Sequence, residues 1–151
     1  MSLRFRYQPI AMGHAVVSLG GRSVRPRALL AVTILGPLGS RARDAVLDTA
    51  ADDTIFSNSL AAQIGLDLTN APSGTGSAIG MAMVPVQYAQ VRLRLTDGIE
   101  QREWSAWVGF TPVGLPYPML GFAGCLQFFT STFHGDREEV ELSPNSLYTG
   151  S

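Results

Sequence analysis

Two strand-like segments joined by a tight turn constrain the fold of this chain more than any other feature. Val91-Arg92-Leu93-Arg94-Leu95 alternates strictly between apolar and polar residues, which is the period of a half-buried strand. Asp97-Gly98 follows as a strong hairpin-turn signal, and Trp104 to Phe110 supplies the apolar returning strand. The sequence therefore predicts a β-hairpin in this region.

The same pattern of strand and turn recurs along the chain. Ala28 to Leu35 is an apolar, β-branched run that ends at a Gly-Pro-Leu-Gly turn, and Ala45 to Leu47 resumes the strand. Thr130 to His134 and Glu138 to Leu142 flank Gly135-Asp136 and predict a last hairpin. Because strands dominate and no repeat is evident, we predict an all-β, barrel-like domain.

One or two short helices are expected among these strands. Ser57 to Leu66 is the better candidate, since Leu60 and Ile64 recur at helical spacing and Gly65 suits a helix end. Its serines can cap the first turn. Leu120 to Phe129 is apolar with two glycines, and it is the second candidate.

Composition excludes several classes of protein. The chain has 151 residues, which fits one domain, and no apolar run approaches the roughly 20 residues that span a bilayer. A net charge of −1 gives no reason to expect nucleic acid or anionic lipid as a partner. The N-terminus lacks the pattern of a secretory signal, so the expected location is the cytoplasm.

The cysteine and histidine content argues against redox and metal chemistry. Cys125 is the only cysteine, which excludes an internal disulfide, and its apolar neighbours indicate a buried side chain. His14 and His134 have no acidic or cysteine neighbours at metal-ligand spacing. We therefore expect neither a metal nor another cofactor.

A single carboxylate is placed where a chemical role is conceivable. Asp48 closes an apolar strand and is followed by small residues, which leave room for a substrate backbone. Taken alone, the pattern indicates a turn aspartate that accepts hydrogen bonds from nearby backbone N–H groups.

The wider context resembles a known family. Ala45 to Phe56 is similar to the active-site segment of retropepsin-like aspartic peptidases, in which two apolar residues precede Asp, Thr or Ser, Gly and Ala. The retroviral version continues with Asp-Asp-Thr and an apolar pair, as this chain does. Met119-Leu120-Gly121 resembles the second family signature, and Gly74 to Met83 stands where the family has a glycine-rich flap.

The resemblance covers roughly Ala28 to Leu142 and implies a fold and an organisation. It implies a retropepsin-like acid-protease barrel with one or two short helices over residues 28–143. Residues 1–27 are then an N-terminal extension that can contribute an edge strand, and residues 144–151 a loose C-terminal tail.

The resemblance also implies an activity. Aspartic peptidases use two carboxylates about 3 Å apart that share one proton, because like charges so close cannot both ionise. This chain has one Asp-Thr segment of this kind, so a peptidase would be a homodimer with Asp48 from each subunit. The implied function is an aspartic endopeptidase acting on a peptide or protein substrate.

Further roles carry over from the family to matching positions. Thr49 and Ala50 correspond to residues that support the active-site loop. The positions that correspond to substrate-binding residues are Ala51, Asp52, Asp53, Ser77, Ala78, Ile79 and Gly80.

Two departures leave alternatives open. Ala50 replaces the usual glycine, and Phe122 stands where retroviral members have an arginine that pairs with the acidic residue corresponding to Asp52. A retropepsin-like binding or scaffolding domain without catalysis is therefore the alternative. A third interpretation is a β-barrel interaction module in which the Asp-Thr segment is coincidental.

Overall fold

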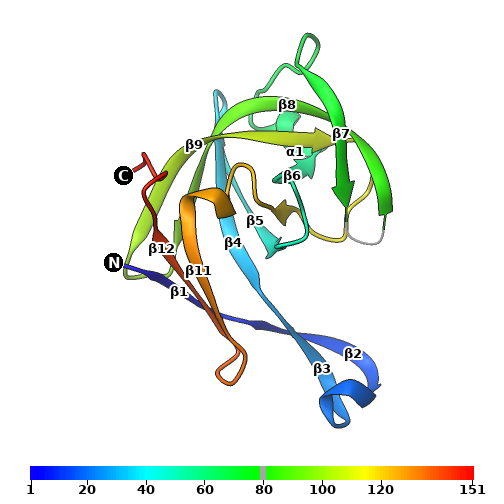
Figure 1. Cartoon of the computed structure of the whole chain (residues 1–151). Coiled ribbons are helices and arrows are strands. Elements are labelled where there is room, and N and C mark those ends of the chain that lie inside the picture. Colours follow the sequence, from blue (N-terminus) through cyan, green and yellow to red (C-terminus); the bar gives the residue numbers. More distant parts are fainter. Residues whose placement is uncertain (79–80) are drawn as a thin grey trace.

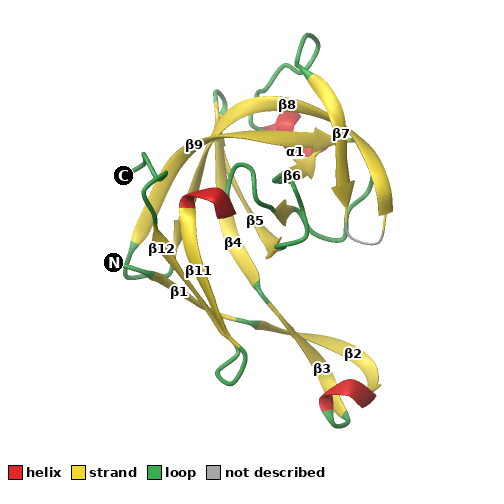
Figure 2. Ribbon diagram, in the orientation of Figure 1, coloured by secondary structure: helices red, strands yellow, loops and turns green. Residues whose placement is uncertain are grey.

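The computed structural model describes residues 1–78 and 81–151, and strands make up most of it (Figures 1 and 2). Strands account for 58% of the chain and helices for 8%, which confirms the all-β prediction. The strands are β1 (Leu3–Arg6), β2 (Gln8–Val16), β3 (Arg22–Arg27), β4 (Leu29–Gly36), β5 (Gly39–Leu47), β6 (Ile55–Ser57), β7 (Ser73–Ala78), β8 (Met81–Thr96), β9 (Gln101–Thr111), β10 (Met119–Leu120), β11 (Phe129–His134) and β12 (Glu139–Pro144).

The largest sheet contains the first of the hairpins that the sequence predicts. Its strand order is β4-β5-β10-β6-β9-β8-β7, and β4 also pairs with β8. The β8–β9 hairpin pairs Thr96 with Gln101 across the Asp97-Gly98 turn, as predicted. Alternate residues of these strands, such as Leu93 and Leu95, are fully buried, so the period-2 pattern does mark the core face.

Register in this sheet brings two distant segments together. The short strand β10 runs parallel to β5, with Met119 opposite Val46 and Leu120 opposite Leu47. The same strand pairs antiparallel with β6 through Met119 and Ile55. The chain segments that follow β5 and β10 therefore start side by side, although more than 70 residues separate them.

A second sheet joins the two ends of the chain. It has the order β1-β12-β11, so the N-terminal strand β1 lies at an edge and its Leu3 is fully buried in the core. The β11–β12 hairpin is the predicted last hairpin. The C-terminal tail was expected to be loose, but Ser151 exchanges two backbone hydrogen bonds with Glu103, at 2.9 and 3.0 Å. Tyr148 packs against Trp104 and Phe129, which explains why the tail is fixed.

Helical structure is shorter than the sequence predicts. Helix α1 covers Asn58–Gln63, and Gly65 with a φ of 81° ends it in the expected place. The predicted second helix at Leu120–Phe129 is wrong, because Leu120 belongs to β10 and only the 3-10 turn η2 (Leu126–Phe128) follows. None of the helices in the described residues is long and apolar enough to cross a membrane.

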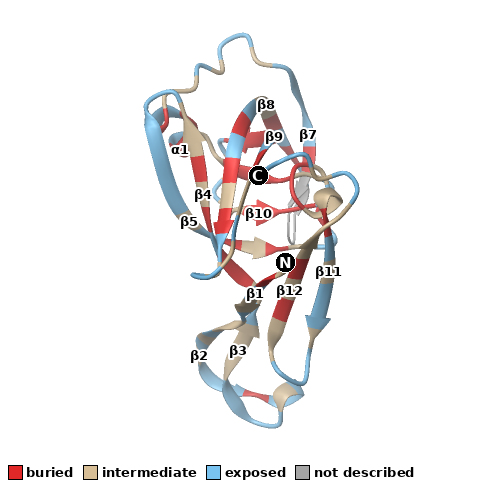
Figure 3. Ribbon diagram, turned by 90° about the vertical axis from the view of Figure 1, so that its left-hand side faces the viewer, coloured by how far each residue is buried: buried red, intermediate tan, exposed pale blue. Residues whose placement is uncertain are grey.

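Residues 8–27 form a separate two-stranded ribbon, which we call the arm. Strands β2 and β3 pair with each other and with no other strand of the described chain, and the 3-10 turn η1 (Val17–Leu19) lies at the tip. The arm projects below the two larger sheets (Figure 1), and most of its residues are exposed or half-buried (Figure 3).

Candidate active site

Asp48 lies directly after β5, in a turn that fixes its carboxylate. The Asp48 N–H donates to the Leu120 carbonyl at 3.1 Å, so pairing of β5 with the second segment continues past the strand end. The carboxylate oxygen Oδ1 accepts a hydrogen bond of 2.9 Å from the Ala50 N–H. Asp48 therefore accepts a hydrogen bond from a nearby backbone N–H group, as the sequence predicts for a turn aspartate. The carboxylate is half-buried, and its other oxygen can accept hydrogen bonds from further partners.

Thr54 ties the Asp48 segment to the segment after β10. Its side chain is fully buried, and its Oγ1 donates to the Ala123 carbonyl at 2.8 Å and accepts from the Gly121 N–H at 3.2 Å. The Thr54 N–H also donates to the Ala123 carbonyl. Sequence reasoning matched this threonine to the family pattern without assigning it a role, and the role depends on a partner that lies 67 residues away.

Gly121 allows these two segments to lie in direct contact. A Cβ built on Gly121 would overlap the Asp53 carbonyl and stand 2.7 Å from the Ala51 carbonyl oxygen. Beyond it, the Phe122 N–H donates to Ala51 and the Ala123 N–H donates to Asp52, both at 2.9 Å. The two segments thus run as a short parallel ladder that positions Asp48.

The alanine at position 50 causes no backbone strain. Among the described residues, Glu138 is the only non-glycine residue with a positive φ, so Ala50 has an ordinary conformation for an L-residue. Its side chain is exposed, as is that of Thr49. Within the subunit, alanine in place of the usual glycine therefore does not strain the backbone at position 50.

The β7–β8 hairpin packs against this site. Val84 and Val86 of β8 form a small buried cluster with Ala51, Ile55 and Met119, separate from the main core. Gly76 of β7 lies against this cluster, since a Cβ on it would come within 2.8 Å of the Ile55 Cδ1 atom. The hairpin therefore covers the segment that follows Asp48.

The predicted substrate-binding residues occupy different environments. Ala51 is buried in the cluster below the hairpin, whereas Asp52 is exposed. Ser77 and Ala78 end β7, and Ile79 and Gly80 lie outside the described residues.

Asp53 has a partner that sequence reasoning missed. Its Oδ2 accepts a hydrogen bond of 2.9 Å from the Tyr88 hydroxyl, which connects β8 to the Asp48 segment. Burial, together with the hydrogen bond to Asp53 and its negative charge, raises the pKa of Tyr88 to about 12. The period-2 pattern places Tyr88 on one face of β8, but no local signal indicates the carboxylate that it meets.

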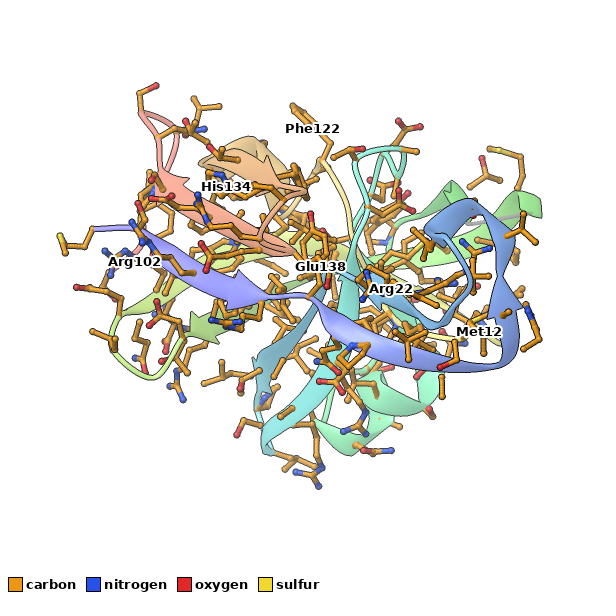
Figure 4. The ribbon with its side chains drawn as sticks, turned by 90° about the horizontal axis from the view of Figure 1, so that it is seen from below. Met12, Arg22, Arg102, Phe122, His134 and Glu138 are labelled. Atoms are coloured by element: carbon orange, nitrogen blue, oxygen red, sulfur yellow. The ribbon has the colours of Figure 1, made fainter. Side chains whose placement is uncertain are left out.

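The site is acidic and lacks a paired cation within the described residues. No ion pair there involves Asp48, Asp52 or Asp53. Phe122, where an arginine would provide such a cation, is 59% exposed and projects from the surface (Figure 4). The described part of the chain also contains no cluster of three or more His, Cys, Asp or Glu side chains that could hold a metal.

Cys125 is not available as a nucleophile. It is fully buried, and burial raises the pKa of its thiol to about 12. The prediction that it packs as a small apolar residue is confirmed, and Asp48 stands as the chemical candidate at this site.

The Thr54→Val variant is expected to be less stable by about 1–3 kcal/mol, because valine leaves the buried Gly121 N–H without an acceptor. Urea denaturation of the two proteins measures this difference. Thr132→Val is the matched control, since Thr132 is exposed on β11, and it should change stability by less than about 0.5 kcal/mol. Equal losses in both variants would show that Thr54 does not join the two segments.

The Tyr88→Phe variant tests the contact between β8 and Asp53 through its pH dependence. The folded-state pKa of Tyr88 lies above the ordinary 10.0, so the stability from this contact is complete below pH 10.0. It is lost as the pH rises through about 12. Wild type should therefore be the more stable protein near neutral pH, and its advantage should narrow at about pH 11. An advantage that does not depend on pH would contradict the contact.

A comparison with models of known protein families and a comparison with curated proteins each found no match.

Proposed function

We propose that this chain is one subunit of an aspartic endopeptidase with a retropepsin-like barrel. The observation that carries the proposal is the placement of Asp48. It follows a strand, is fixed by the Ala50 N–H, lies against the Gly121 segment and has a β-hairpin packed beside it. The pairing of β4 with both β5 and β8 supports the barrel as the framework of the site.

The chemistry requires a second carboxylate, and a second copy of the chain supplies it. The sequence contains no second segment that is equivalent to the one with Asp48. Thr49 and Ala50 are exposed, so this segment is open to a symmetry-related copy. In a twofold homodimer, the two Asp48 segments would meet at the axis.

The paired Asp48 carboxylates would share one proton and act on a water molecule. The ionised carboxylate takes a proton from the water as its oxygen attacks the peptide carbonyl carbon. The protonated carboxyl donates a hydrogen bond to the carbonyl oxygen and stabilises the tetrahedral intermediate. Transfer of a proton to the leaving nitrogen then accompanies C–N cleavage. Because one carboxyl must stay protonated, activity is expected at acidic to mildly acidic pH.

The hairpin explains how an extended peptide would bind. Strand β7 is at the edge of the large sheet, so it can pair with a peptide through main-chain hydrogen bonds. The apolar cluster below it extends to the partly buried Val113 and Leu115. The exposed parts of these two side chains favour hydrophobic residues next to the cleaved bond.

The test of this function is the cleavage of a peptide library at different enzyme concentrations. We expect cleavage next to hydrophobic residues, with a specific activity that falls on dilution as the dimer dissociates. Sedimentation measured over the same concentrations gives the dimer fraction. Full specific activity in samples that sediment as monomers would contradict the paired-carboxylate mechanism.

A retropepsin-like binding or scaffolding domain is the second candidate. The exposed Phe122 favours it, because no cation pairs with Asp52 among the described residues. This candidate differs from the first in one observable: the folded dimer would cleave no member of the library from acidic to neutral pH.

A further inference from the structure

The arm, residues 8–27, does not contribute to either apolar core of the subunit. Within the described residues, no arm residue belongs to the two clusters of buried side chains or packs against them, although Val16 is itself buried. A two-stranded ribbon is at best marginally stable in water by itself. The arm nevertheless exposes apolar side chains, with Val17 at its tip 92% exposed.

Two contacts with the β11–β12 turn fix the direction of the arm. Arg22 donates from both terminal guanidinium nitrogens to the Glu138 carboxylate, at 2.5 and 3.4 Å, and Figure 4 shows these side chains facing each other. The Glu138 carbonyl accepts a hydrogen bond of 2.7 Å from the Tyr7 N–H at the base of the arm. Glu138 adopts a φ of 49° in this turn, a conformation that is unfavourable for a non-glycine residue. The arm is therefore braced while most of its surface is left uncovered.

Charge indicates what kind of surface would cover the arm. The arm contains Arg22, Arg25 and Arg27 and no acidic residue, whereas all twelve acidic residues of the chain lie elsewhere. Arg25 and Arg27 form no ion pair within the described chain. Together with Leu19 and Pro26, they line a hollow of about 310 Å³. Such a hollow suits a segment that is partly apolar and partly acidic.

A pairing of strands is not the expected mode of contact. Pro9 and Pro26 lie opposite each other in the arm, and neither can donate a ladder hydrogen bond. Prolines of this kind protect edge strands from pairing with another sheet. The side chains of the arm, including its arginines, are thus the groups available for contact.

From these observations we infer that the arm reaches onto a second copy of this chain, where Arg25 and Arg27 contact its acidic body. The inference rests on the proposed homodimer and adds the element that holds it together. Outside the arm, the chain has eight arginines against its twelve acidic residues, so the body of the second copy has the complementary charge. In a twofold dimer, each arm would contact the other subunit, and the contact would occur twice.

The first test reverses the free charges of the arm. The variant with Arg25→Glu and Arg27→Glu is compared with wild type by sedimentation equilibrium. Because like charges would then face each other across the interface, we expect the dimer Kd to rise at least about tenfold. The control is Arg41→Glu with Arg43→Glu, the same charge change on β5 outside the arm, and its Kd should stay within about twofold of wild type. If the variant with Arg25→Glu and Arg27→Glu had the same dimer Kd as wild type, the inference would be overturned.

The second test removes the arm. Gln8 and Arg27 lie directly opposite each other, so a two-residue Asn-Gly turn can replace residues 9–26 and join them. We expect this variant to keep the circular dichroism spectrum of a β protein and to dimerise more weakly than wild type. A folded, armless protein that dimerises like wild type would equally overturn the inference.

The failure of the inference can be distinguished from the failure of the proposed function. An active wild-type dimer whose Kd is unchanged by both arm variants would refute the role of the arm alone. If both arm variants dimerise more weakly than wild type and the wild-type dimer cleaves no peptide, the result would support the role of the arm and refute the peptidase activity. Binding of the arm to an acidic protein or to nucleic acid, with a monomeric wild type, would refute the second copy as its partner.

Discussion

The Asp48→Asn variant is expected to lose peptide cleavage and to keep the fold of wild type. In the homodimer the change removes both carboxylates, so neither the base for water nor the shared proton remains. Positioned acid–base groups contribute about 10²–10⁴-fold to a rate, and the loss in kcat/KM should be at least of this order. The fold should survive, because an asparagine oxygen can still accept the hydrogen bond from the Ala50 N–H.

The control for this variant is Asp44→Asn. Asp44 is an exposed residue on the same strand β5, and it lies before the turn that positions Asp48. Cleavage rates and thermal denaturation of both variants should be measured side by side. Asp44→Asn should match wild type in both. Full activity in a folded Asp48→Asn protein would refute the assignment of Asp48.

The Gly121→Ala variant is expected to be strongly destabilised. Its methyl group would overlap the Asp53 carbonyl and crowd the Ala51 carbonyl, and backbone cannot move aside as a flexible side chain can. Overpacking of this kind costs about 3 kcal/mol or more, since the ladder between the two segments must also break. The melting temperature should fall by about 6–12 °C, and activity should fall because Asp48 loses its support.

Gly114→Ala is the matched control for this variant. A Cβ on Gly114 meets no atom within 4 Å, and its φ is not positive, so alanine fits there without strain. Its melting temperature should therefore stay close to that of wild type. If calorimetry gave the same melting temperature for both alanine variants, the Gly121 segment would not lie against the Asp48 segment as described.

Local pattern was sufficient to predict the parts of the fold that depend on neighbours in sequence. The β8–β9 and β11–β12 hairpins each combine alternating residues with a turn, and both are present. The end of β5 at Leu47, immediately before Asp48, also follows from a short apolar run. In each case the information lies within about 20 residues, which is the range over which strand periodicity and turn chemistry act.

The parts that could not be predicted depend on distant partners. Leu120 begins an apolar run that predicts a short helix, but its pairing with Leu47 of β5 makes it a strand residue. The C-terminal tail reads as loose, yet Tyr148 reaches the aromatic core around Trp104. The hydrogen bond from Tyr88 to Asp53 likewise joins residues 35 positions apart. Tertiary packing overrides local preference in the first two cases, and in the third no local signal exists.

The most direct test of the central claim is the separation of the two Asp48 carboxylates in a crystal structure of the dimer. We expect them to lie about 3 Å apart across a twofold axis, close enough to share one proton and one water molecule. Asp48 carboxylates that are far apart in every assembly of the crystal and of the solution dimer would contradict an aspartic peptidase built from this chain.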